Sequence, residues 1–402
     1  MKRYLLLISL AILTGGCLFA RPRPTTQPVV AATETSPVAT ETFTAIPPSE
    51  TPRPLTATPT MELTQTPAAY GPTDFPAHVD PLTGKEVSDP QLLERRPVAV
   101  KVQMFPRGQR PPWGVSLADI VYDYYQNFGL TRFHAIFYSQ DAQMVGPVRS
   151  ARLLDIDLVA MYKSIFAFGS AERRTFSRLF GQDFAPRLVI EGNANCPPLC
   201  RMDPNGNNYL VANTKDLSAY VATKGVDNAR QKLDGMRFEA APPTGGQAGQ
   251  QIYIRYSISA YARWDYDAAS GRYLRWQDVQ EAADQQGEAY EPLVDRLNNQ
   301  QIAADNVVIL IAPHQYAFNS RPGPNEVIDI GLTGSGPAYA FRDGQMFEAT
   351  WNRPTKDSVL YLTLSDGSLY AFKPGNTWYQ VVGKTSKISV EAGVWRFQHL
   401  IP

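Results

Sequence analysis

The sequence predicts an α+β fold in two parts, an N-terminal α/β-type domain followed by a mainly antiparallel β domain. Three observations predict it. Strand-like and helix-like segments alternate between residues 97 and 224, which is the pattern of strands covered by helices. From residue 252 onward apolar and polar residues alternate with a period of two, as in half-buried strands. A Thr- and Pro-rich segment, residues 21–72, separates both parts from the N-terminus.

The first seventeen residues predict export and lipid attachment. Lys2 and Arg3 precede an apolar run, Tyr4–Leu13. A run of about ten residues has the length of a signal-peptide core and is too short to cross a bilayer. Two glycines then lead to Cys17, as the site of a lipoprotein signal peptidase requires. We therefore predict that lipid on Cys17 anchors the protein to the outer face of the cell membrane; the alternative is an ordinary secretory signal with an incidental cysteine.

Residues 18–75 are predicted to form a disordered stalk. The sequence of this segment repeats Thr-Pro and Thr-x-Thr and contains few aromatic and few charged residues. Such a composition cannot bury enough apolar surface to offset its ordering entropy. Proline also favours extended polyproline conformations. The stalk is expected to hold the globular part away from the membrane, through a cell wall or surface layer.

The N-terminal domain is predicted over residues 76–238. Alternation at 97–103 indicates its first strand, and β-rich runs at 119–125 and 131–139 indicate two more, joined by a turn at Asn127–Gly129. Three helical patterns follow: a helix leading into a short buried strand at 152–168, and helices at 172–180 and 215–224.

A linker at residues 239–250, rich in Gly and Pro, precedes the C-terminal β-rich domain, residues 251–402. The even positions from Ile252 to Tyr266 are apolar or aromatic, which predicts a strand pattern with one core face. Asp-Gly pairs at 343–344 and 366–367 predict hairpin turns. Further strands are predicted at 273–276, 306–312, 338–341, 359–364, 369–372 and 378–382.

Several strings resemble the YerB-like lipoprotein family, whose members pair an N-terminal and a C-terminal domain of unknown function. They include RPVAVKV, ADIVYD, LTRFHAIF and VGPVRSAR in the first part, and ARWDYDAASGRYLRW, GSGPAYAFRDGQMFEATWNRPTKDS and LSDGSLYAFKPGNTWYQVV in the second. The resemblance covers most of residues 80–383 and implies a two-domain extracytoplasmic lipoprotein. The chain departs from the family pattern at Val100–Met104, where many relatives read Val-Met-Ile-Asp-Asn. It departs again at Phe166–Ser170, where many read His-Ala-Gly-Gly-Ser.

A candidate anion-binding site lies at Gly146-Pro-Val-Arg149-Ser150-Ala-Arg152. Ser150 is predicted to cap a helix, whose free N–H groups carry partial positive charge. Arg149 and Arg152 add two full charges, so a phosphate, pyrophosphate or carboxylate would balance the site. The alternative, which we favour, is internal pairing of these arginines with Asp155, Asp157 or Asp119.

Two further residues are candidates for the same site. Arg132 and His134 face one side of the strand at 131–139, so both can reach the pocket. His134 serves equally well as a hydrogen-bonded core residue, which is the more common role. The complete set of candidate anion-binding residues is Arg149, Ser150, Arg152, Arg132, His134, Asp119 and Asp155.

Composition excludes several classes of protein. Lys and Arg number 38, as do Asp and Glu, so no basic field favours nucleic acid. The four histidines are far apart, which predicts no metal site. The exported chain has only Cys196 and Cys200 besides Cys17, which predicts a disulfide. No dinucleotide or phosphate-loop fingerprint indicates a cofactor.

The leading hypothesis for function is a non-catalytic envelope protein that binds a cell-wall component or another envelope protein. No nucleophile elbow, His-Glu-x-x-His or Walker sequence is present. Asp155 and Asp157 lie two residues apart and therefore face different ways on either a helix or a strand. The alternative is an enzyme that modifies envelope polymers by phosphoryl transfer or glycan hydrolysis.

Overall fold

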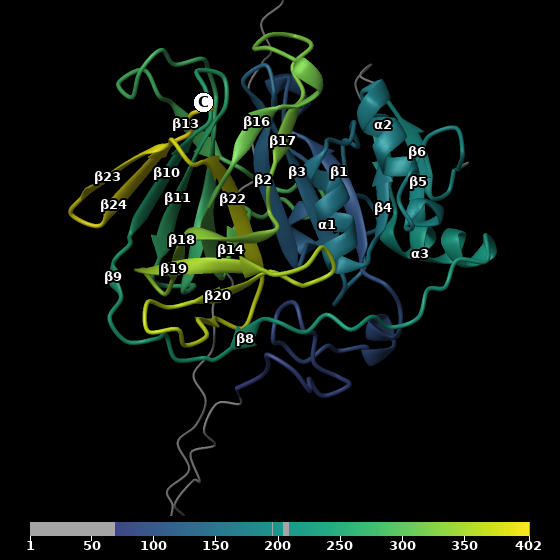
Figure 1. Cartoon of the computed structure of the whole chain (residues 1–402), viewed down its shortest axis with the longest axis horizontal. Helices are drawn as coiled ribbons and strands as arrows, with labels where there is room; N and C mark the ends of the chain where they lie inside the picture. The colour runs from purple at the N-terminus through teal and green to yellow at the C-terminus, as the bar shows by residue number, and fades with distance from the viewer. Residues whose placement is uncertain (1–68, 195, 204–208, 402) are drawn as a thin grey trace, which may run out of the picture. The chain divides into compact units, whose positions relative to one another are not determined.

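The fold is built on an 11-stranded sheet, in a computed structural model that describes residues 69–194, 196–203 and 209–401 (Figure 1). Both predicted domains contribute strands to it. At its centre β2 (Ile120–Asn127) pairs in parallel with β22 (Thr377–Gly383), so that the two halves of the chain are hydrogen-bonded to each other. The described residues of both halves accordingly belong to one compact unit.

The remaining strands of this sheet come from both halves of the chain. They are β1 (Val98–Gln103), β3 (Leu130–Phe137), β4 (Ile165–Phe168), β5 (Leu188–Ile190), β9 (Gln247–Ala248), β15 (Asn306–Ala312), β18 (Gly334–Arg342), β19 (Gln345–Arg353) and β20 (Tyr361–Thr363). Their order is β20-β19-β18-β15-β22-β2-β3-β1-β4-β5, with β9 beside β19. The structure is mostly β, as expected of its second half, and the described residues contain three α-helices.

The three helices lie in the N-terminal half, where the sequence predicts them. Helix α1 (Leu154–Tyr162) leads into the buried strand β4, as expected of residues 152–168. Helices α2 (Arg173–Phe180) and α3 (Thr214–Thr223) each begin after a side chain that accepts backbone N–H groups. These caps are Glu172 and Asn213, which satisfy donors that the first turn leaves free.

A second sheet, of seven strands, forms the other layer of the C-terminal half. Its strands are β10 (Gln251–Arg255), β11 (Tyr261–Asp267), β12 (Arg272–Asp278), β13 (Tyr290–Pro292), β14 (Ala303–Ala304), β23 (Lys387–Glu391) and β24 (Val394–Gln398). Their order is β13-β12-β11-β10-β24-β23, with β14 beside β12. Of these strands the sequence did not indicate β13, β14, β23 or β24, and it also did not indicate β19 of the first sheet.

The alternation from Ile252 to Tyr266 belongs to a hairpin and not to one continuous strand. The Ser257 hydroxyl accepts the N–H groups of Ser259 and Ala260, which turns the chain between β10 and β11. Ile252 then lies opposite Trp264. Cross-strand partners share a face of a sheet, so the even positions of the two strands still lie on one face, whereas Ile258 between them is exposed.

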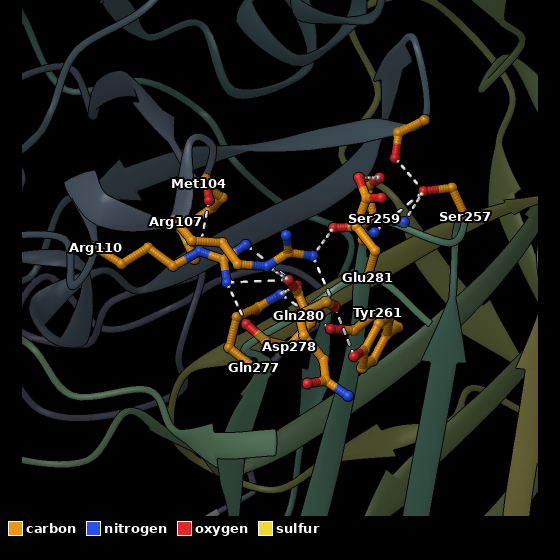
Figure 2. A network of polar contacts seen from close by, with 12 residues as sticks. Met104, Arg107, Arg110, Ser257, Ser259, Tyr261, Gln277, Asp278, Gln280 and Glu281 are labelled. Carbon is orange, nitrogen blue, oxygen red and sulfur yellow. Dashed lines mark hydrogen bonds and ion pairs between the residues drawn. The ribbon is translucent and has the colours of Figure 1, made fainter. Parts of the chain in front are cut away.

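Polar contacts join the loop after β1 to the second sheet (Figure 2). Arg107 Nε lies 2.6 Å from Asp278 Oδ1, and Arg110 Nη2 lies 3.2 Å from Asp278 Oδ2. The Arg107 guanidinium also donates to the carbonyl oxygens of Ser259 and Gln280. Asp278 is fully buried, so these two arginines supply the partners that a buried carboxylate needs.

The predicted signal peptide, Cys17 and most of the predicted stalk lie outside the described residues. Near the predicted end of the stalk at residue 75, the chain already contacts the globular unit. Tyr70 and Phe238 exchange two backbone hydrogen bonds, and the rings of Phe75 and Phe238 pack edge to face. Apolar burial by these aromatic residues outweighs the Pro-rich composition around them. No helix among the described residues has the length and apolar character needed to span a membrane.

Candidate functional site

The arginine-containing segment Gly146–Arg152 is extended and hydrogen-bonded to neighbouring backbones, and its residues Arg149, Ser150 and Arg152 are partly exposed. Val148 N–H donates to Leu210, Arg149 N–H to Lys101 and Ala151 N–H to Ser170. The expectation that Ser150 caps a helix is wrong, because α1 begins only at Leu154 and its N-cap residue, Leu153, makes no side-chain cap. The Ser150 hydroxyl instead lies 2.9 Å from that of Ser170.

Arg152 and Arg132 bind only neutral oxygens within the described part of the chain. Arg152 donates to the Ala151 carbonyl at 2.9 Å and to the Asn127 side-chain oxygen at 3.0 Å. Arg132 donates to the Ser150 carbonyl at 2.8 Å. Neither guanidinium has a described carboxylate within 4.0 Å, so the predicted pairing of Arg152 with Asp155, Asp157 or Asp119 is absent there.

Neither of these two arginines has an ion-pair partner among the described residues, although the charge of Asp155 acts on both. Burial, with the nearby charges of Arg152 and Arg149, lowers the pKa of Arg132 to about 9. Burial also lowers the pKa of Arg152, although the Tyr124 and Asp155 side chains oppose that change. Crowded cations in a partly desolvated place favour an anion beside them.

Arg152 lines a cavity of about 410 Å³. Hydroxyl groups of Ser150 and Ser170 lie on its wall, where they can donate hydrogen bonds. The wall also holds the ion pair of Arg174 with Glu172, whose Nε and Oε1 are 2.8 Å apart. The other lining residues are Asn127, Ala171, Thr175, Pro324, Asn325, Glu326 and Val327.

Arg149 does not share this cavity. Its guanidinium donates to the Gln109 side-chain oxygen at 3.0 Å, and it is absent from the cavity wall. Burial and the charge of Arg201 lower its pKa. The structure therefore separates the two arginines that the sequence places together, because consecutive extended residues point in opposite directions and Arg149 and Arg152 are an odd number of residues apart.

Asp155 is the centre of a fully buried polar cluster that is bonded to the backbone of Arg152. Its Oδ1 lies 3.1 Å from Lys101 Nζ, 2.8 Å from His134 Nδ1 and 2.5 Å from the Tyr124 hydroxyl. Its Oδ2 accepts the backbone N–H of Arg152 at 2.6 Å. All four side chains are at most 1% exposed, so His134 is a core residue, the more common of its two expected roles.

The electrostatics of this cluster follow from burial around one carboxylate. Burial lowers the pKa of Lys101 to about 7, against the attraction of Asp155. For Asp155 burial acts in the opposite direction, but the charge of Lys101 and the hydrogen bond from His134 outweigh it and lower the pKa. Burial lowers the pKa of His134 as well, with Asp155 opposing. The carboxylate thus remains ionised and holds the strand residues and the start of α1 together.

Sequence reasoning missed Lys101 and Tyr124. The signal was a lysine among the apolar residues of the strand Val98–Gln103. The structure buries every residue of this strand. A lysine in a strand buried on both faces needs an acid nearby. The sequence does not say which acid, because the partner lies in a different element, α1.

Asp119 lies away from the arginines, contrary to its expected place beside them. Its Oδ2 accepts the backbone N–H of Ser139 at 2.9 Å, and its Oδ1 accepts the Ser139 hydroxyl. Burial raises its pKa, against these hydrogen bonds. It lines a different cavity, of about 450 Å³, together with Lys85, Arg272 and Asp305.

The remaining candidate residues concern covalent and metal sites. A disulfide joins Cys196 and Cys200, as their pairing in the exported chain predicts. Among the described residues, no three side chains of His, Cys, Asp or Glu are grouped so that they can hold a metal ion.

Comparisons with known proteins match both halves of the chain. The family described as "Protein of unknown function (DUF3048)" matches with its N-terminal domain over residues 82–227 and with its C-terminal domain over residues 252–379. The YerB protein of Bacillus subtilis (strain 168), named as a lipoprotein, is 27% identical over 324 residues, 78% of this chain and 88% of that protein. A crystal structure of YerB from the same organism is similar with a TM-score of 0.59 and 25% identity, covering 76% of this chain and 96% of that chain.

Proposed function

This chain belongs to the DUF3048 family, and on that premise we propose that it is a lipid-anchored envelope protein that binds an anionic group at the Arg152 cavity. The family match confirms the resemblance stated from the sequence. The proposed role is non-catalytic: the protein recognises a cell-wall component or an envelope protein that carries phosphate or carboxylate.

The anchoring part of the proposal is supported by the N-terminus and by the relative. The apolar run before Cys17 has the length of a signal-peptide core, and the similar Bacillus subtilis protein is named as a lipoprotein. Lipid on Cys17 would place the globular unit outside the cell at the end of a Thr- and Pro-rich stalk.

The binding part rests on one observation: among the residues that the structure describes, Arg132 and Arg152 have only neutral oxygens as partners. Arginine binds phosphate and carboxylate through two parallel N–H groups. Arg152 supplies the cation at the cavity wall, and the bonded pair of Ser150 and Ser170 hydroxyls has one further O–H to donate. The volume of about 410 Å³ suits a small charged group at the end of a larger molecule.

The buried cluster around Asp155 supports a binding role over a catalytic one. Lys101 has the pKa of a general base, about 7, but its side chain is fully buried and cannot contact a substrate in the cavity. Its contacts orient the backbone of Arg152 through Asp155. We therefore assign the cluster a positioning role for the proposed site.

Ligand-dependent stabilisation tests the proposal. Thermal unfolding of the compact unit, residues 64–402, is measured with inorganic phosphate, pyrophosphate, and wall fragments carrying phosphate or carboxylate. A ligand at one hundred times its dissociation constant stabilises the folded state by about 2.7 kcal/mol, and we expect at least one probe to do so. Arg152→Ala should abolish this stabilisation.

Arg149→Ala is the matched control, because its guanidinium lies outside the cavity. It should retain the ligand-induced shift. The proposal fails if no probe shifts the transition, or if both variants lose the shift equally. Release of phosphate or sugar from a probe during the assay would instead support the alternative, an envelope-polymer-modifying enzyme.

A further inference from the structure

Strand β23 is an open edge of the seven-stranded sheet. It pairs with β24 alone among the described strands, and all five of its residues are exposed. Figure 1 shows the β23–β24 hairpin extending from the rest of the sheet. Ile388 and Val390 are 37% and 50% exposed. An edge strand with unpaired backbone groups and exposed apolar side chains is a template for another strand.

The hairpin geometry shows which backbone groups are free. Glu391 and Val394 flank a two-residue turn, Ala392–Gly393, whose φ angles of 47° and 82° are those of a type I′ turn. Residues that flank such a turn exchange both hydrogen bonds, and the pattern alternates along the strand. The N–H and C=O groups of Ile388 and Val390 therefore point to the open edge.

The sequence of β23 is complementary to itself in the antiparallel direction. We propose that β23 pairs with β23 of a second copy of this chain, about a twofold axis at Ser389. Lys387 then lies opposite the partner's Glu391, and Ile388 lies opposite the partner's Val390. The register agrees with the free groups, because Ile388 and Val390 of both copies would form the hydrogen-bonded pairs.

Side-chain placement supports the same register. Ile388 lies opposite Phe397 and Val390 opposite Trp395 in the hairpin, so the two exposed side chains continue the apolar face of the sheet. Pairing would bring four such side chains together and cover them. Two ion pairs between Lys387 and Glu391 would form on the opposite face. The interface is isologous, so assembly stops at two copies.

Cysteine cross-linking of the full-length chain in membranes tests this pairing. Two Ser389 positions would form a non-hydrogen-bonded pair with Cα atoms about 4.5 Å apart, which is within the range of a disulfide. Ser389→Cys should therefore give a covalent dimer on non-reducing gels. Thr385→Cys, exposed but outside the strand, should remain at the background of the wild-type chain. Equal cross-linking of the two variants would overturn the proposal.

Charge reversal tests the register. In the Ser389→Cys background, Lys387→Glu places two acids opposite each other at both ends of the interface and should cause loss of the dimer band. Adding Glu391→Lys restores opposite charges and should restore the band. An unchanged unfolding midpoint would show that the monomer fold is intact. A dimer that is insensitive to the first change, or not rescued by the second, would contradict the pairing.

Discussion

At the scale of single residues, Asp155 organises the N-terminal half through four partners from different elements. It accepts from Lys101, Tyr124 and His134 and from the backbone of Arg152. Because the carboxylate satisfies these groups away from water, each partner depends on its charge. The adjoining Arg132 and Arg152 have no carboxylate within ion-pair distance among the described residues, and this difference distinguishes a structural ion pair from the proposed binding site.

The buried ammonium of Lys101 predicts a pH-dependent stability. Burial lowers its pKa to about 7 in the folded state, whereas the unfolded chain keeps the proton up to about pH 10. The unfolded state therefore binds more protons between pH 7 and 10, and the free energy of unfolding rises with pH. The expected contribution is about 1.4 kcal/mol per pH unit.

Urea unfolding at pH 7, 8 and 9 measures this contribution when wild type is compared with Lys101→Met. The variant keeps the side-chain volume but cannot titrate, so its free energy of unfolding should rise less steeply. The comparison uses the difference in slope, from which the titrating groups that are not coupled to Lys101 cancel. Parallel pH profiles for the two proteins would show that Lys101 keeps its ordinary pKa.

At the scale of elements, side chains of the C-terminal half accept hydrogen bonds from turns and loops of the N-terminal half. Asp295 Oδ1 accepts the N–H of Gly114 at 2.7 Å, and its Oδ2 accepts the N–H and hydroxyl of Ser116 at 2.8 and 2.7 Å. An acid from the C-terminal half thus caps a helical turn of the N-terminal half. Asp278, also from the C-terminal half, forms ion pairs with Arg107 and Arg110 in the loop after β1 (Figure 2).

Asp295→Ala should therefore destabilise the protein strongly. The side chain is fully buried, and its loss leaves several buried donors without an acceptor, at a cost of about 2–4 kcal/mol. Chemical unfolding measures the change. Asn298→Ala is the control. Asn298 is exposed, and its described side-chain hydrogen bonds, to the Ser116 hydroxyl and from the Gln300 N–H, are exposed as well, so the substitution should change the free energy of unfolding by less than about 0.5 kcal/mol. Similar effects of the two substitutions would contradict the capping role.

At the scale of the whole molecule, the parallel pairing of β2 with β22 makes the folding of each half depend on the other. Without the C-terminal half, β2 would expose an edge of buried apolar residues in the middle of the sheet. The hydrophobic core likewise includes residues from both halves. The two matched family domains are therefore expected to fold as one cooperative unit.

A fragment ending at residue 238 tests this dependence. We expect it to aggregate and to lack a cooperative transition, since β2 has no second neighbour. Size-exclusion chromatography and near-ultraviolet circular dichroism measure both properties. The control is the intact chain cleaved at an inserted protease site between Thr244 and Gly245, two exposed positions, whose pieces should stay associated and folded. A monomeric fragment with a cooperative transition would show that the N-terminal half folds independently.

The sequence alone determined the features that depend on neighbouring residues. Strands β1–β3, the three helices and the turn near Gly129 follow from periodicity and turn chemistry, because these act within a few residues of the chain. The family resemblance and the Cys196–Cys200 disulfide could also be predicted from the sequence. The turn that divides residues Ile252–Tyr266 into two strands could not be predicted, because a hairpin whose strands are in register keeps the same alternation of apolar and polar residues.

Only the tertiary structure decided which distant residues meet. It placed β22 beside β2, paired Lys101 with Asp155, and directed Arg149 and Arg152 to different surroundings. Such choices depend on packing and desolvation summed over many contacts, and a local pattern fits several partners equally well. The sequence therefore determined that arginines gather near Gly146, and the fold determined that Arg152 alone of that segment's two arginines lines the cavity.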